Sequence, residues 1–174
     1  MIDFRQNYFE LFGLQPRFHL DLPQLEQAYR HIQSRVHPDK FVHASDSERR
    51  ASMQSATQVN EAYRTLKSPL PRARYLLALN HAEVQSESNT AMPPEFLLEQ
   101  MQWRESVEEA ADRPEELVTL ALRLGREMQE HYAQLERHLD KESDHAHAAD
   151  SVRKLMFFER LREEISDALE RSEA

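Results

Sequence analysis

The sequence has 174 residues, with 31 acidic and 22 basic side chains, two glycines and no cysteine. A net charge of −9 argues against nucleic acid as a partner, because phosphates favour a basic surface. Without cysteine neither a disulfide nor a thiolate metal site can form, and a reducing cytoplasm is the expected setting. We find no signal peptide and no apolar run of about 18 residues, so we expect neither export nor a membrane partner.

Two helices are predicted in the first 37 residues. The first covers residues 7–12, and Gly13 can supply the left-handed conformation that ends it. The second begins after Asp21, a good N-cap, with Pro23 in its first turn. Its apolar stripe consists of Leu22, Leu25, Tyr29, Ile32 and Val36. This helix is therefore predicted to bury one face.

The second helix ends in an unusual polar sequence, His37-Pro38-Asp39-Lys40. Proline disfavours the helical conformation in the residue before it, so the four residues are predicted to form a loop and not a helix face. Arg30 and Arg35 lie on the helix away from its apolar stripe. The loop is therefore expected to stand beside a small basic surface.

A third helix is predicted over residues 47–67, with its cap at Ser45, Asp46 or Ser47. Its apolar stripe consists of Ala56, Val59, Ala62, Tyr63 and Leu66, with Met53 near its start. After two prolines a short helix is expected to begin at about Pro71. Residues 81–94 lack apolar periodicity and are predicted to link two domains, residues 1–80 and 95–174.

Three longer helices are predicted in the second domain. They begin after Pro94, at Pro114 and near Ala146, and short connections predict an antiparallel three-helix bundle. The fold class is therefore all-α. In the first of these helices, Phe96, Trp103, Val107 and Ala110 suffice for the core. Leu97, Leu98 and Met101 are then surplus apolar residues, in a segment with eight acids between residues 95 and 116, which is typical of a protein-binding surface.

The first domain resembles the J-domain of DnaJ-type co-chaperones, which is an antiparallel helical hairpin with short flanking helices. The resemblance covers Tyr29-Arg30, the HPDK sequence at residues 37–40, NEAYRTL at residues 60–66 and SPLPRARYL at residues 68–76. It implies docking on the ATPase domain of a DnaK-type chaperone and stimulation of its ATP hydrolysis. The residues implied in docking are His37, Pro38, Asp39, Lys40, Arg30 and Arg35.

The chemistry of these residues agrees with that role. Asp39 offers a carboxylate for charge-assisted bonds to an arginine, and Pro38 fixes the turn that presents it. The basic side chains suit an acidic partner surface. Gln33, Ser34 and Val36 depart from the commoner J-domain pattern and suggest a specialised chaperone.

The whole chain is similar to HscB, the co-chaperone family of iron–sulfur cluster biogenesis. YFELFGL near the start and VRKLMFFERLREEI near the end carry this resemblance, and the lack of an N-terminal cysteine cluster fits the bacterial form. It implies that the bundle binds the scaffold protein IscU and that the J-domain delivers IscU to the chaperone HscA. The implied scaffold-binding residues are Leu97, Leu98, Met101, Gln102, Glu105 and Phe157, although relatives carry an acid at the position of Gln102.

Three other interpretations stay open from the sequence. The chain could be a J-domain co-chaperone for other clients. It could bind a metal through His31, His37 and His43, or be a metal-dependent enzyme built on its histidines. DHAHAAD at residues 144–150 could also hold a metal through His145 and His147, although it is expected to be a polar loop between helices. We favour a co-chaperone that is not an enzyme and needs no cofactor.

Overall fold

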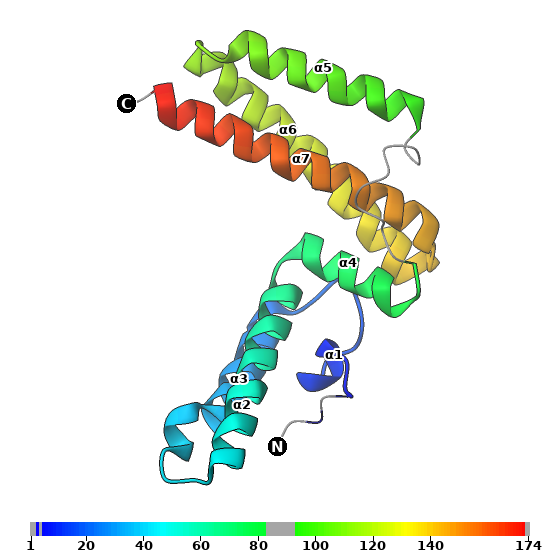
Figure 1. Ribbon diagram of the computed structural model, residues 1–174. Helices are drawn as coiled ribbons and strands as arrows, with labels where there is room; N and C mark the ends of the chain where they lie inside the picture. Colours follow the sequence, from blue (N-terminus) through cyan, green and yellow to red (C-terminus); the bar gives the residue numbers. More distant parts are fainter. Residues whose placement is uncertain (1–2, 4, 83–92, 173–174) are drawn as a thin grey trace. The chain divides into compact units, whose positions relative to one another are not determined.

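The computed structural model describes residues 3, 5–82 and 93–172. The chain divides into two compact units, Met1–Leu76 and Leu77–Ala174. All regular structure in the described residues is helical, so the all-α prediction is confirmed (Figure 1). The predicted linker, residues 81–94, falls mostly on residues 83–92, which lie outside the described residues. No helix in the described ranges combines the length and apolarity that a bilayer crossing requires.

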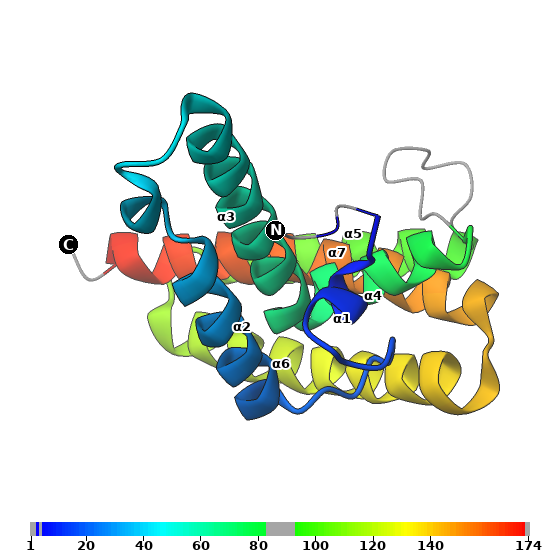
Figure 2. The same ribbon diagram turned by 90° about the horizontal axis from the view of Figure 1, so that it is seen from below.

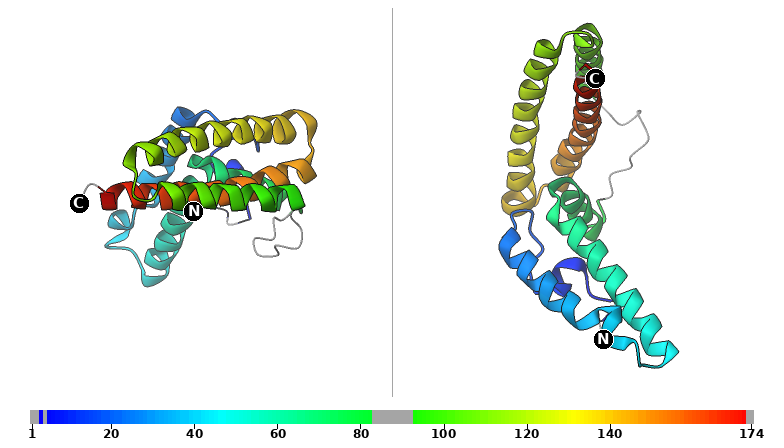
Figure 3. Two further views of the ribbon diagram at one scale, coloured as in Figure 1. Left: turned by 90° about the horizontal axis from the view of Figure 1, so that it is seen from above. Right: turned by 90° about the vertical axis from the view of Figure 1, so that its left-hand side faces the viewer.

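The first unit is built on a hairpin of α2 (Leu22–Val36) and α3 (Asp46–Lys67), which lie side by side in Figure 1 and in the right-hand view of Figure 3. Asp21 caps α2 as predicted, and Ser45 caps α3 in a capping box with Glu48. Leu25 of α2 and Val59 of α3 are fully buried in the core of this unit. The hairpin predicted from the J-domain resemblance is therefore confirmed.

Residues of the sequence NEAYRTL, on α3, contact α2 and the beginning of the chain. The Tyr29 hydroxyl of α2 donates to the Asn60 side chain at 3.0 Å, and its ring stacks on Tyr63 with centroids 4.0 Å apart. Glu61 bonds to the side chain of Tyr8, whose pKa is raised by burial and then by that carboxylate. These contacts fix α2 and the start of the chain against α3.

Helix α1 (Tyr8–Leu11) and the part of α4 (Pro69–Leu79) up to Leu76 complete the first unit. Helix α1 has a capping box between Asn7 and Glu10, and Gly13 ends it with a φ of 67°. Helix α4 begins two residues before the predicted Pro71. The ring of Tyr8 stacks on Tyr75 of α4, with centroids 4.4 Å apart, and the Tyr75 hydroxyl accepts from the Tyr8 backbone N–H at 3.0 Å. The start of the chain is thereby tied to α4.

The predicted stripe of α3 is wrong at its beginning. Ser52 and Ser55 are buried there, whereas Met53 is 60% exposed. Both serines continue the spacing of three and four residues that leads to Val59, and Met53 lies about 100° away from Ser52 on the helix. In α2 the predicted stripe is also one residue too long, because Leu22 is exposed in the first turn.

The second unit contains α5 (Pro94–Ala110), α6 (Pro114–Glu136) and α7 (His145–Ser172), and Figures 2 and 3 show each reversing the direction of the one before. The antiparallel bundle is confirmed. A π-helical segment, η3 (Arg137–Glu142), extends α6 and leads into the turn before α7. Because α7 begins at His145, most of DHAHAAD is helical and the predicted loop there is wrong.

The bundle core is centred on Phe158 of α7. Phe96 and Trp103 of α5 pack edge-on against its ring, at centroid distances of 6.3 and 6.2 Å, and His131 of α6 lies 5.6 Å away. Phe96, Trp103 and Ala110 are buried as predicted. The core of α5 is thus made by one side of the helix, and its other side is left to the surface.

Candidate interaction surfaces

The sequence HPDK forms a tight turn at the end of α2. The helix stops at Val36 as predicted, and the predicted loop contains one turn of 3₁₀-helix, η1 (Pro38–Phe41), with His37 as its N-cap. Proline supplies the fixed φ that such a first turn favours. The α-helix therefore does not continue through HPDK, and the turn that replaces it has a defined geometry.

The His37 ring braces this turn. Its Nδ1 accepts from the Asp39 backbone N–H at 3.3 Å and lies 3.3 Å from Asp39 Oδ2. The Asp39 side chain is 86% exposed. The carboxylate is therefore exposed to solvent, and the hydrogen bond to His37 already orders the backbone of its turn. Little conformational entropy would be lost when a partner binds it.

A buried serine anchors the turn to α3. In a continuing helix the Val36 carbonyl would accept from the N–H of Lys40, but that N–H donates to the His37 carbonyl at 3.0 Å. The buried Ser52 hydroxyl donates to the Val36 carbonyl instead, at 2.7 Å. This bond satisfies an end-of-helix acceptor and explains why a serine occupies a core position of α3.

Replacing Ser52 by alanine should destabilise the J-domain. The variant leaves the Val36 carbonyl buried without a partner, which costs about 1–3 kcal/mol. We expect a lower urea midpoint with an unchanged slope, measured by circular dichroism. The matched control is Ser34→Ala, because the Ser34 hydroxyl donates to the His31 carbonyl on an exposed part of α2. Equal midpoints for the two variants would contradict the anchoring role of Ser52.

Exposed basic side chains lie on α2 and in the turn that follows it. Arg30 and Arg35 are exposed on α2, and Arg30 pairs with Glu26 one turn earlier. Lys40 is exposed in η1. The three basic residues predicted for docking therefore lie on α2 and the turn that follows it, all accessible to a partner.

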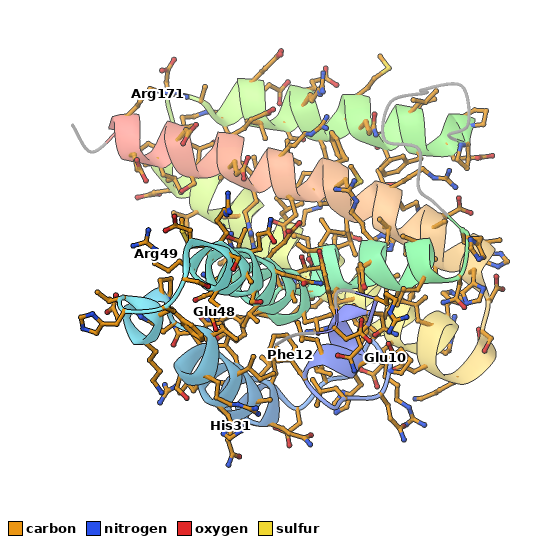
Figure 4. All side chains as sticks on the ribbon, turned by 60° about the horizontal axis from the view of Figure 1, so that its bottom comes forward. Glu10, Phe12, His31, Glu48, Arg49 and Arg171 are labelled. Atoms are coloured by element: carbon orange, nitrogen blue, oxygen red, sulfur yellow. The ribbon has the colours of Figure 1, made fainter. Side chains whose placement is uncertain are left out.

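A groove of about 560 Å³ lies beside Asp39 and was missed by the sequence interpretation. Its lining comes from the turn and the start of α3: Pro38, Asp39, Val42, Asp46, Arg49, Arg50 and Met53. Figure 4 shows Arg49 on the outer side of α3, where it pairs with Asp46 at 2.6 Å. Steps of four and three residues back from the buried Val59 reach Ser55 and Ser52. This spacing was the signal that could have placed Met53 at the surface.

The second surface lies on α5 and α7 of the bundle. Leu98 and Met101 are 60% and 70% exposed, and Gln102 and Glu105 are exposed on the same helix. Leu97 is half-buried. We call Leu97, Leu98, Met101, Gln102, Glu105 and Phe157 the α5 patch.

Phe157 joins the α5 patch from α7. It is half-buried, and its ring meets Phe96 edge-on with centroids 5.8 Å apart. Phe96 is itself 2% exposed and belongs to the core. Phe157 therefore rests on the packed core of the bundle, which holds its ring in place.

The histidines proposed as metal ligands are not brought together. Figure 4 shows His31 on the outer side of α2, and His37 is engaged with Asp39. Over the described ranges of the chain, no three His, Asp or Glu side chains are grouped to hold a metal ion. His147 instead contacts the Asp144 carboxylate, with Nδ1 2.6 Å from Oδ2, and this contact raises the pKa of His147.

Known proteins show the same sequence pattern and the same fold. Residues 92–166 match the family model described as the HSCB C-terminal oligomerisation domain. A co-chaperone protein HscB homolog from Azoarcus sp. (strain BH72) is 52% identical over 171 residues, which cover 97% of each chain.

Solved structures agree with this comparison. Chaperone HscB from Vibrio cholerae is similar with a TM-score of 0.86 and 38% identity, covering 96% of this chain and 99% of that one. Human co-chaperone protein HscB is similar with a TM-score of 0.90 and 29% identity, covering 94% and 82%. The chain therefore belongs to the HscB family of co-chaperones.

Proposed function

We propose that this co-chaperone binds an IscU-type iron–sulfur scaffold protein and delivers it to an HscA-type chaperone of the DnaK class. The J-domain, residues 1–80, stimulates the chaperone's ATPase, and the bundle, residues 95–174, holds the scaffold. The chain itself makes and breaks no bond. We place this exchange in the cytoplasm, without a bound cofactor, nucleic acid or membrane.

One observation carries this proposal: two exposed residue sets stand in separate compact units. In the J-domain, Asp39 is exposed on a braced turn beside Arg30 and Arg35. In the bundle, Leu98 and Met101 are exposed although burying a large apolar side chain contributes about 1.5–3 kcal/mol. An apolar surface left on a helix with a complete core is what a partner-binding face requires.

We assign chaperone docking to His37, Pro38, Asp39 and Lys40 with Arg30 and Arg35. In this assignment Asp39 bonds an arginine of the chaperone, and the basic side chains steer an acidic surface toward the turn. We assign scaffold binding to the α5 patch. Its leucines and Met101 supply apolar contact, and Glu105 and Gln102 supply the polar rim.

The proposal is tested by steady-state ATP hydrolysis of an HscA-type chaperone. Four mixtures are compared: chaperone alone, with this co-chaperone, with IscU, and with both. We expect the rate with both to exceed the sum of the two separate increases, because the J-domain and the cargo then reach the chaperone together.

An unrelated unfolded protein should replace IscU as the specificity control. If it raises the rate as much as IscU does, the chain is a J-domain co-chaperone for general clients. If IscU adds nothing to the effect of the co-chaperone, the proposed delivery of scaffold is wrong.

A further inference from the structure

A half-open pocket lies at the surface of the bundle where α6 passes into η3, and Pro93, just before α5, also lines it. Its volume is about 250 Å³. The side chains that line it come from α6, η3 and α7 and are mostly hydrogen-bond donors: His131, Gln134, His138, His147, Ser151 and Lys154. None of these residues belongs to the α5 patch or to the J-domain, so the proposed function makes no use of the cavity.

His131 is the deepest of these groups. It is 9% exposed, and burial, followed by the nearby charge of Lys154, lowers the pKa of its ring. Gln134 hydrogen-bonds the ring, but within the described residues His131 Nδ1 has no partner. A buried ring nitrogen without a partner costs about 1–3 kcal/mol, which a bound group could recover.

Of the two charged side chains that line the cavity, the basic one, Lys154, is the one left to meet a bound group. Lys154 lines it and places its Nζ 5.2 Å from the centre of the Phe96 ring. The one carboxylate in the lining, Asp150, is already engaged by Arg153. A metal ion entering here would meet an ammonium group with no free carboxylate to offset it.

Two further histidines have one ring nitrogen already occupied. His138 Nδ1 lies 2.9 Å from Glu142 Oε2, and His147 Nδ1 lies 2.6 Å from Asp144 Oδ2. The two rings stack with centroids 5.5 Å apart. Each carboxylate favours a protonated Nδ1, and the raised pKa of His147 favours its doubly protonated, cationic form. In that form Nε2 is a donor.

We propose that this cavity is a binding site for a small oxyanion, a phosphate or a carboxylate. Lys154 supplies the fixed positive charge, and His131 supplies an N–H donor from Nδ1 in the matching tautomer. His147, near the rim, adds a donor when it is cationic. Oxyanions accept several charge-assisted hydrogen bonds at once, which is what this set of side chains offers.

The pKa of the His131 ring should change when an anion occupies the cavity. A bound oxyanion should raise this pKa, because it offsets Lys154 and accepts from the protonated ring. The charged groups around the site are Lys154, Asp150 and Arg153 of α7, Glu99 of α5, Glu127 of α6, Arg137 and Glu142 of η3, and Asp144. Screening of the acids would lower the pKa of the His131 ring, so at constant ionic strength a rise on adding an anion reports binding.

The experiment titrates the full chain with sodium phosphate and, separately, with sodium acetate. Sodium chloride at equal ionic strength is the reference, and the imidazole signals are followed by ¹H–¹⁵N correlation spectroscopy. We expect a saturable shift centred on His131 and a higher pKa for its ring. Lys154→Met should weaken the affinity roughly tenfold to a hundredfold, as expected when a charge-assisted hydrogen bond is lost.

Lys141→Met is the matched control, because Lys141 is exposed in η3 and does not line the cavity. Its affinity should equal that of the unsubstituted chain. Saturation with phosphate alone would identify a phosphate site, and saturation with acetate as well would identify a carboxylate site. A response no larger than that to chloride, or equal affinities for the two lysine variants, would overturn the proposal.

Discussion

Replacing Asp39 by asparagine should remove the stimulation of the chaperone's ATPase while leaving the protein folded. The substitution keeps the size of the side chain but removes the charge that we propose to bond an arginine of the chaperone. Loss of one charge-assisted bond costs about 1.5–3 kcal/mol, so stimulation should fall at least about tenfold. The measurement is the steady-state rate of ATP hydrolysis at saturating IscU.

Asp46→Asn is the matched control for this variant. Asp46 is also an exposed carboxylate beside the same groove, and its pair with Arg49 is a surface ion pair of little energetic weight. We expect Asp46→Asn to stimulate as the unsubstituted protein does. If both asparagine variants stimulate normally, the turn is not the trigger and the J-domain resemblance is one of fold alone.

A second large effect is expected at the α5 patch. The double variant Leu98→Ala/Met101→Ala should bind IscU at least about thirtyfold more weakly, because each central apolar contact in an interface contributes more than about 1 kcal/mol. Both side chains are mostly exposed, so the thermal midpoint of the bundle should change little. Isothermal titration calorimetry with purified IscU measures the affinity.

The control for that variant is Val118→Ala/Leu122→Ala on α6. These two residues are 48% and 64% exposed, so the control removes apolar surface of similar exposure from another helix. It should leave IscU binding unchanged. Equal weakening by both double variants would mean that the scaffold does not choose the α5 patch over other apolar surface.

Helix positions were predictable because their signals are local. Asp21 caps α2 through its own side chain, and Pro38 ends that helix through its own ring. The stripe that ends in Leu66 repeats at the helical period, so the inner face of α3 followed from spacing alone over its second half. The same reasoning separated Phe96 and Trp103, which are buried, from Leu98 and Met101, which are exposed.

What the sequence did not reveal depends on contacts between distant residues. The spacing of α3 places Ser52 on the inner face, but the bond from its hydroxyl to a carbonyl 16 residues earlier cannot be seen in that spacing. His131 is buried because its ring packs on Phe158 of another helix, which its neighbours along α6 do not indicate. The wider π-helical segment after Glu136 has no sequence signal comparable to a cap or a proline.

The exposed thioether of Met101 makes the α5 patch open to oxidation. Peroxide transfers one oxygen atom to such a sulfur, giving a sulfoxide and water, and turns a flexible apolar side chain into a polar one. Met101 is 70% exposed, whereas Met128 in the core of the bundle is 4% exposed and protected. Oxidative stress would therefore reach the α5 patch before it reached the core of the bundle, and a methionine sulfoxide reductase could restore the thioether.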